Sequence, residues 1–371
     1  MKMNWKNLLT VVMMTGAAMS VTSCDDDDVK ETEDQALKLV NANFVDATVV
    51  PTYNGLVGTT AEMIKALEAG KIAEAGQAWK ESRQYWEWSE AFLFGAASGY
   101  GIDPHIDTWP FDAAAFNNNM SKYNPSENEA DAANMEEIIA TGQGLTGFHA
   151  VEYILFREGQ VRTELTDNEL WFATAAANDL YLSALKLVMA WGGELTKEQE
   201  AILEEAEFEC DDFSEEFKNA GQAGSRWKTV TGASVQIIEG CQNIIDEVAH
   251  SKIGAPYTGE DTNYIESPHA YNSIQDFYDN IQSCRHALYG LTPDAGNNAT
   301  PAAKSLIAYT LVKYPAETAK VQAALEASLL AINAMPKPFV LNFQDPKVGL
   351  AIKALEELDE ALSELKSKLA E

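Results

Sequence analysis

The chain has 371 residues, of which 46% are hydrophobic and 22% are charged, a composition typical of a globular protein with a sizeable core. Its formal net charge at pH 7 is −31. A surface this acidic repels phosphate backbones and anionic lipid head groups, so the charge excludes nucleic-acid binding and electrostatic membrane binding. The same charge attracts cations, although a need for solubility alone also explains it.

The N-terminus has the features of an export signal. Residues 1–23 combine a basic start with an apolar stretch that is too short to span a membrane. Val21-Thr22-Ser23-Cys24 then resembles a bacterial lipobox, in which Cys24 is lipidated and becomes the first residue. Residues 24–33 form an acidic linker, and its aspartate run resembles the surface-export signal of Bacteroidetes lipoproteins. We therefore expect an outer-membrane lipoprotein of the cell envelope, with surface exposure if the acidic run acts as that signal.

Nearly all of the chain after residue 33 has helical periodicity, and no segment has the alternation expected of a strand, so we predict an all-α fold. Pro51 lies inside the first helix and should kink or break it. A long irregular connection, residues 99–127, is expected to be functional because of its length. The predicted helices span about residues 34–69, 72–97, 129–140, 146–157, 166–191, 197–220, 226–253, 269–289, 301–334 and 346–369.

The best domain boundary is the pair Gly192-Gly193, which ends one helix directly before a capping box opens another at Thr196. Residues 34–193 would form an N-terminal helical bundle and residues 194–371 a C-terminal one, in tandem and with about four helices each. Leucines at alternating spacings of three and four predict a core-facing row on the last helix. These leucines are Leu355, Leu358, Leu362, Leu365 and Leu369.

One predicted helix, within Gly147–Phe156, is apolar on every side and is therefore expected to be buried. It nevertheless contains His149 and Glu152, which at this spacing lie within about 60° of each other on one face. A buried imidazole and carboxylate each need a partner or a cation. The two side chains can therefore pair with each other, or they can hold a metal ion together.

Other charged side chains are candidates for the same site. Glu87 and Glu90 lie three residues apart on the second helix, and Arg83 lies one turn before Glu87. Arg83 and Glu87 can equally form a solvated ion pair that contributes only a few tenths of a kcal/mol. Asp107 lies in the long connection, just before Trp109. The sequence alone does not bring these residues together.

The remaining histidines and cysteines have no such setting. We interpret His105, His250, His269 and His286 as surface or structural residues. The cysteines after residue 24, which are Cys210, Cys241 and Cys284, are expected to be buried thiols or to form at most one disulfide. The chain has no HExxH motif, so it does not match an ordinary zinc protease.

Several stretches together resemble the imelysin family, which is also described as insulin-cleaving membrane protease-like or iron-regulated. The family motif GxHxxE corresponds to Gly147, His149 and Glu152. Two further motifs of the family resemble residues 86–95 and 106–110, and its second half resembles residues 266–290. The resemblance implies two pseudo-symmetric four-helix bundles, with a functional site near the domain interface around the GxHxxE helix.

The resemblance also implies an exported protein linked to iron uptake, alongside other envelope iron-uptake proteins. Our first hypothesis is binding of a metal ion or chelate, with iron or zinc as the metal. The expected metal ligands are His149, Glu152, Glu90 and Asp107, and further ligand-binding residues are Arg83, Glu87, Trp109 and Gly147. The second hypothesis is a metallopeptidase with Glu152 or Glu90 as catalytic base. The third is a structural His–Glu pair in a lipoprotein that binds a partner or glycan.

Overall fold

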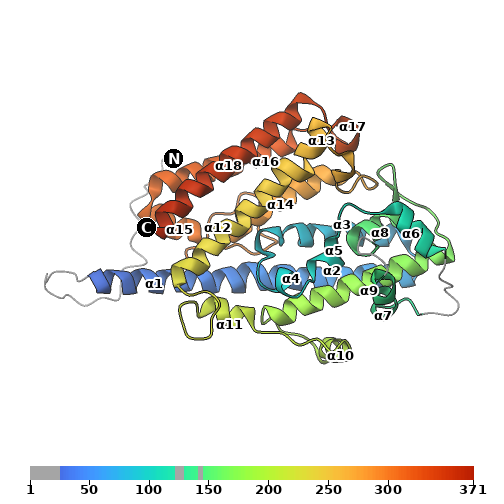
Figure 1. The fold of residues 1–371 in the computed structure, drawn as a ribbon, viewed down its shortest axis with the longest axis horizontal. Helices are drawn as coiled ribbons and strands as arrows, with labels where there is room; N and C mark the ends of the chain where they lie inside the picture. The colour runs from blue at the N-terminus through green and yellow to red at the C-terminus, as the bar shows by residue number, and fades with distance from the viewer. Residues whose placement is uncertain (1–25, 122–128, 141–144) are drawn as a thin grey trace, which may run out of the picture.

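The computed structural model describes residues 26–121, 129–140 and 145–371, and it confirms the all-α prediction (Figure 1). The predicted signal peptide and Cys24 lie outside these residues. Within the described ranges, no helix combines the length and apolarity needed to cross a bilayer.

The first half of the chain contains α1 (Asp26–Asn43), η2 (Phe44–Val49), α2 (Val50–Glu68), α3 (Ile72–Glu87), η3 (Glu90–Phe92), α4 (Ala96–Gly99), α5 (Asp103–Asp107), α6 (Ala113–Met120), α7 (Ala132–Ile139), α8 (Gly147–Leu155), β1 (Phe156–Arg157), β2 (Gln160–Val161) and α9 (Asp167–Ala190). The second half contains α10 (Lys197–Glu205), α11 (Phe213–Lys218), α12 (Val230–Asp246), η4 (Glu247–Lys252), α13 (Gly254–Thr258), η5 (Thr262–Tyr264), α14 (Ser273–Tyr289), α15 (Leu306–Lys313), α16 (Pro315–Asn333), α17 (Phe339–Asn342) and α18 (Pro346–Ala370).

Four sequence expectations about these elements were wrong in detail. The connection predicted to be irregular over residues 99–127 contains two short helices, α5 and α6. The helix predicted over 72–97 ends at Glu87, and short turns follow it. The helix predicted over 197–220 is two separate helices, α10 and α11. A two-stranded hairpin, β1–β2, also occurs where no strand was expected. Its two turn residues, Glu158 and Gly159, both have positive φ, which is the geometry that tight hairpin turns require.

The helices pack in two groups. In the first group α2 contacts α3 and α9, and α8 packs against α3 and α9. In the second group α12 and α14 lie between α16 and α18 on one side and the first group on the other (Figure 1). Helix α1 packs on α12 and α15, although it precedes the first group in sequence. The boundary at residues 193–194 therefore stays a prediction.

The apolar row predicted on the last helix is confirmed. Its leucines are buried, and α18 packs along α16 and α12. The start of this helix is also as expected, because the Asp345 side chain accepts a hydrogen bond from Lys347 N and Pro346 occupies the first turn. This half of the molecule supplies a rigid apolar support for α12 and α14.

Candidate functional site

The GxHxxE glycine has a steric role. Gly147 has φ +74°, and a Cβ at this position would lie 2.3 Å from the carbonyl oxygen of Ile106. Only glycine therefore allows the first turn of α8 to approach the backbone of α5 so closely. Because Ile106 directly precedes Asp107, this contact brings Asp107 to the helix that carries His149. As expected, nearly every residue of α8 is buried.

His149 is 2% exposed and lies between two carboxylates. Its Nε2 is 2.9 Å from Asp107 Oδ1, without the angle of a hydrogen bond, and its Nδ1 is 3.8 Å from Glu152 Oε2. Burial lowers the pKa of His149, but the two carboxylates outweigh it and raise the pKa to about 9. The imidazole is therefore a cation at neutral pH when nothing else supplies positive charge.

Glu152 does not form a simple hydrogen-bonded pair with His149, since 3.8 Å is too long for a hydrogen bond. Its Oε1 instead accepts hydrogen bonds from the backbone N–H groups of His269 and Ala270, each at 2.7 Å. Glu152 thereby ties α8 to the segment that leads into α14. Its other oxygen faces Nδ1, the arrangement by which a carboxylate orients a metal-binding imidazole from behind.

Arg83 lies at the centre of the charged groups and is fully buried. Its Nη1 is 2.7 Å from Asp107 Oδ1, and its Nη2 is 2.5 Å from Glu87 Oε1 and also contacts Glu266. The interpretation of Arg83 and Glu87 as a solvated pair is therefore wrong. Tertiary packing covers this face of α3, so the pair is part of a buried network.

Sequence reasoning missed three members of this network, which are Glu266, Lys252 and Asp276. The Oδ1 atom of Asp276 lies 3.8 Å from Arg83 Nε. Lys252 Nζ is 3.1 Å from Glu266 Oε1 and 3.9 Å from carboxylate oxygens of Glu87 and Glu90. Burial raises the pKa values of Glu87 and Glu90 well above that of an ordinary glutamate, although the positive charge of Lys252 opposes this shift. We call Arg83, Glu87, Glu90, Asp107, His149, Lys252, Glu266 and Asp276 the carboxylate cluster.

Two groups of donor atoms in this cluster are close enough to share one cation. Asp107, His149 and Glu266 form one group and Glu87, Glu90 and Asp107 the other, with the donor atoms of each group within 4.8 Å of one another. Asp107 belongs to both. Two of the atoms, His149 Nε2 and Glu266 Oε2, are buried without a hydrogen bond. Such unpaired buried atoms are costly unless something else binds them.

The remaining predicted binding residues lie beside the donor group of Asp107, His149 and Glu266. Glu152 belongs to neither donor group. Glu87 accepts a hydrogen bond from Asn280 Nδ2 on α14. Trp109 packs at the edge of the cluster, with its ring centroid 6.4 Å from that of His149 and 4.7 Å from that of Tyr264. Trp86, whose indole was not predicted to bind, donates to Asp107 Oδ2 at 2.8 Å.

The other histidines differ from one another. His250 is exposed, and the backbone N–H of His269 donates to Glu152. His105 contacts Asp179, and His286 is 1% exposed. The cysteine interpretation holds for Cys241 and Cys284, which are buried free thiols, whereas Cys210 is free and partly exposed.

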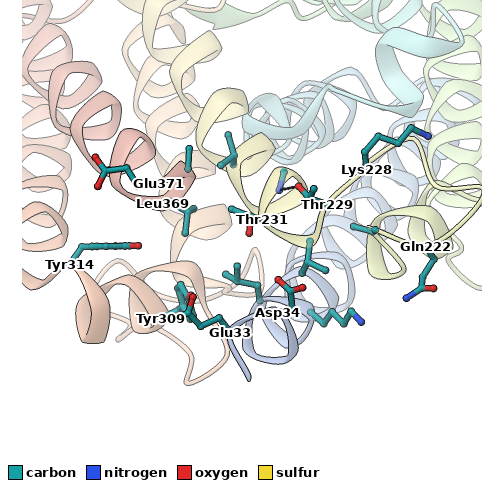
Figure 2. Close-up of a pocket in the computed structure, with 18 residues that line it drawn as sticks. Glu33, Asp34, Gln222, Lys228, Thr229, Thr231, Tyr309, Tyr314, Leu369 and Glu371 are labelled. Atoms are coloured by element: carbon teal, nitrogen blue, oxygen red, sulfur yellow. Dashed lines mark hydrogen bonds between the residues drawn. The ribbon is translucent and has the colours of Figure 1, made fainter. Parts of the chain in front are cut away.

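Two cavities open at the surface. One, of about 880 Å³, lies between α1, α12, α15 and the end of α18, and Figure 2 shows Asp34, Thr231 and Tyr309 among its lining residues. None of its lining residues belongs to the carboxylate cluster. The other, of about 570 Å³, is lined by His250, Glu260, Asp261 and Tyr264. This second cavity lies close to the carboxylate cluster, because its lining residue Tyr264 packs against Trp109 at the edge of the cluster.

Comparisons with known proteins agree with this architecture. Iron-regulated protein A of Synechococcus elongatus is 27% identical over 316 residues, which cover 83% of this chain and 79% of that protein. A crystal structure from Parabacteroides distasonis, assigned as an iron-regulated protein A precursor, has a TM-score of 0.77 at 25% identity and covers 91% of this chain and 95% of its own. An imelysin-like protein from Psychrobacter arcticum shares the fold, with a TM-score of 0.60 at 12% identity over 94% of this chain and 95% of its own.

The sequence profile described as Imelysin matches residues 47–369. This range contains the GxHxxE helix, the two upstream motifs and every member of the carboxylate cluster, as the resemblance implied. The chain therefore belongs to the imelysin family.

Proposed function

We propose that this protein is a cell-envelope lipoprotein that binds a metal ion, in an iron-related role, through the helix that carries GxHxxE. The observation that carries the proposal is the buried group of Asp107, His149 and Glu266, whose donor atoms lie within 4.8 Å of one another. One imidazole nitrogen and two carboxylate oxygens suit zinc and iron. The iron-related role is supported by the similarity to iron-regulated protein A.

The charges of the cluster fit a cation. Arg83 and Lys252 are its only permanent cations among the described residues, and they face five carboxylates. The carboxylates are those of Glu87, Glu90, Asp107, Glu266 and Asp276. A bound divalent ion would replace the positive charge of the His149 proton, and beside Glu87 and Glu90 it would favour their ionised forms against the effect of burial.

Each residue would have a defined task in this proposal. Asp107, His149 and Glu266 would hold the ion, and Glu152 would orient the imidazole through Nδ1. His149 would lose its proton when the ion binds, so metal uptake releases a proton. Arg83 and Lys252 would share Asp107 and Glu266 with the ion and keep the carboxylates in place when it leaves.

The geometry favours binding over peptide hydrolysis. Glu152 is held by two backbone amides, and Glu90 lies 3.9 Å from the buried ammonium group of Lys252. A general base must be free to take a proton from the attacking water. Glu152 is not free in this way, and Glu90 has a cationic neighbour, so the geometry gives metal binding more support than peptide hydrolysis.

The test measures metal content and affinity in protein purified without a histidine tag. Wild-type protein should bind Fe²⁺, under anaerobic conditions, or Zn²⁺ at the cluster, and His149→Ala should abolish that binding. His250→Ala is the matched control, because His250 is exposed and contacts Asp246 and Glu356 instead. If His149→Ala keeps wild-type metal binding while His250→Ala loses it, the cluster is only a structural ion network.

A further inference from the structure

A second group of metal-ligand side chains shares no residue with the carboxylate cluster, although its histidine, His105, lies only two residues before Asp107 on α5. His105 on α5, Glu136 on α7 and Asp179 on α9 offer donor atoms that all lie within 4.8 Å of one another. His105 Nδ1 is 3.3 Å from Asp179 Oδ1 and 4.0 Å from Glu136 Oε1. Three separate helices thus converge on one point outside the carboxylate cluster.

Asp179 gives this group a fixed, buried ligand. Its side chain is 1% exposed, and its Oδ2 accepts a hydrogen bond from Thr146 Oγ1 at 2.9 Å. Its other oxygen, Oδ1, shares a hydrogen bond with His105 Nδ1, so an ion would take the place of the proton between them. A buried carboxylate whose outer oxygen is held by a hydroxyl group is well oriented for metal binding.

The charged partners of this group differ from those of the carboxylate cluster. Over residues 26–121, 129–140 and 145–371, no lysine or arginine forms an ion pair with Asp179 or Glu136, whose only ion-pair partner is His105. Arg83 and Lys252, by contrast, contact several carboxylates of the cluster. The hydrogen bond to Asp179 raises the pKa of His105, so an ion must displace a proton from the imidazole when it binds. Two carboxylates and the resulting neutral imidazole then match the charge of a divalent ion.

We propose that His105, Glu136 and Asp179 form a second metal site, which binds a divalent transition-metal ion independently of the site at His149. The imidazole favours ions such as Zn²⁺ and Fe²⁺ over Mg²⁺ and Ca²⁺. The Glu136 side chain is 50% exposed, so water can complete the coordination and the ion can exchange with solvent. An ion here also fixes α5, the short helix that carries both His105 and Asp107.

The two sites can be separated by counting equivalents of Zn²⁺. Calorimetric titration and metal analysis should give two equivalents for wild-type protein and one each for His105→Ala and His149→Ala. The double variant should bind none at these sites. Glu136→Gln is a second probe that keeps the side-chain volume on an exposed position, and it should weaken the second equivalent by about 10- to 100-fold.

The outcomes test the proposed site at His105 and the proposed function at His149 separately. If wild-type protein binds one equivalent that is lost in His149→Ala alone, the second site does not exist and the proposed function stands. If the single equivalent is lost in His105→Ala alone, the second site stands and the proposed function fails. A second equivalent that disappears only in His250→Ala belongs to the surface pair of His250 and Asp246 and overturns this inference.

Discussion

The regions around His149 and His286 contain equally buried imidazoles, 2% and 1% exposed, in opposite electrostatic surroundings. His149 faces Asp107 and Glu152, which overcome burial and raise its pKa to about 9. His286 packs edge-on against Trp88, and burial together with the neighbouring Arg285 lowers its pKa to about 4. Burial alone therefore does not decide the charge of a histidine here.

Helix α14 contributes acids to both regions. Asp276 faces Arg83 in the carboxylate cluster, while Asp279 accepts a hydrogen bond from the Trp88 indole near His286. Burial raises the pKa of Asp279 to about 7, so this carboxyl group is mostly neutral below that pH. Burial thus favours the neutral forms of His286 and Asp279, whereas the carboxylate cluster concentrates charged groups. A cation is attracted to only one of them.

The largest expected effect comes from Arg83→Met, which leaves several buried carboxylates without their shared cation. We expect a loss of about 3–5 kcal/mol in the free energy of unfolding, measured by urea denaturation. The matched control is Arg285→Met beside His286, whose partner Glu326 is 50% exposed. That variant should lose less than about 1 kcal/mol, because its carboxylate partner remains hydrated. Equal losses in the two variants would contradict the comparison.

The second prediction concerns the pH dependence of stability. His149 has a folded pKa above the unfolded value of about 6.5, so its contribution is fully present below pH 6.5 and is lost as pH rises through about 9. His286 has a folded pKa below the unfolded value, so the unfolded state binds more protons and stability is lost as pH falls from about 6.5 toward 4. Each histidine changes stability by up to about 1.4 kcal/mol per pH unit.

Urea denaturation from pH 4.5 to 9 checks both signs. Relative to wild-type protein, His149→Gln should remove part of the decline on the alkaline side, and His286→Gln should remove part of the decline on the acid side. The differences between variant and wild type isolate each histidine from the acids that titrate in the same range. Two variants with the same pH profile would show that the regions do not differ in charge.

A third prediction tests whether Glu152 orients His149. Glu152→Gln keeps an oxygen that can accept from the amides of His269 and Ala270 but removes the charge that faces Nδ1. We expect metal affinity to fall by about 10- to 100-fold, measured by calorimetric titration with Zn²⁺. Glu164→Gln, at an exposed position, should leave the affinity unchanged. A complete loss of binding in Glu152→Gln would instead make Glu152 a direct ligand.

The apolar parts of this molecule were predicted well from the sequence, because the spacing of neighbouring apolar residues determines which face of a helix is buried. The leucine row of α18 and the start of that helix at Asp345 and Pro346 follow from neighbouring residues alone. In both cases the determining residues lie within one or two helical turns. The break expected at Pro51 does not occur, because the backbone stays helical through it, with a π-helical segment, Phe44–Val49, directly before α2.

The site was only partly predictable. Arg83, Glu87, Asp107 and His149 stood out as charges in apolar or aromatic surroundings, but nothing local indicated that they meet. Glu266 contacts Arg83 across 183 positions of the chain. It opens the stretch that resembles the second half of the family, but nothing local indicated that its side chain reaches Arg83. Lys252 lies at the end of a π-helical turn in the second half. Tertiary packing, which the sequence does not record locally, decides these contacts.

The smallest expected effect is a difference in stability between two variants, each of which loses one indole N–H group, one in each region. Trp86 donates to Asp107, whose pKa is well below its ordinary range because Arg83 and His149 outweigh the effect of burial. Trp88 donates to Asp279, which is mostly protonated at pH 6. A hydrogen bond to a charged group contributes about 1.5–3 kcal/mol, and one between neutral groups about 0.5–1.5 kcal/mol.

Trp86→Phe should therefore destabilise the protein by about 1 kcal/mol more than Trp88→Phe in urea denaturation at pH 6. The two substitutions remove the same atoms, but Trp86 is fully buried and Trp88 only partly, so the loss of packing also differs. The change of the difference with pH therefore isolates the charge of the acceptor. Raising the pH above 7 ionises Asp279 and should narrow the difference, because the Trp88 hydrogen bond then also has a charged acceptor. A difference that stays constant across this range would mean that packing of the indole rings, and not the charge of the acceptor, separates the two regions.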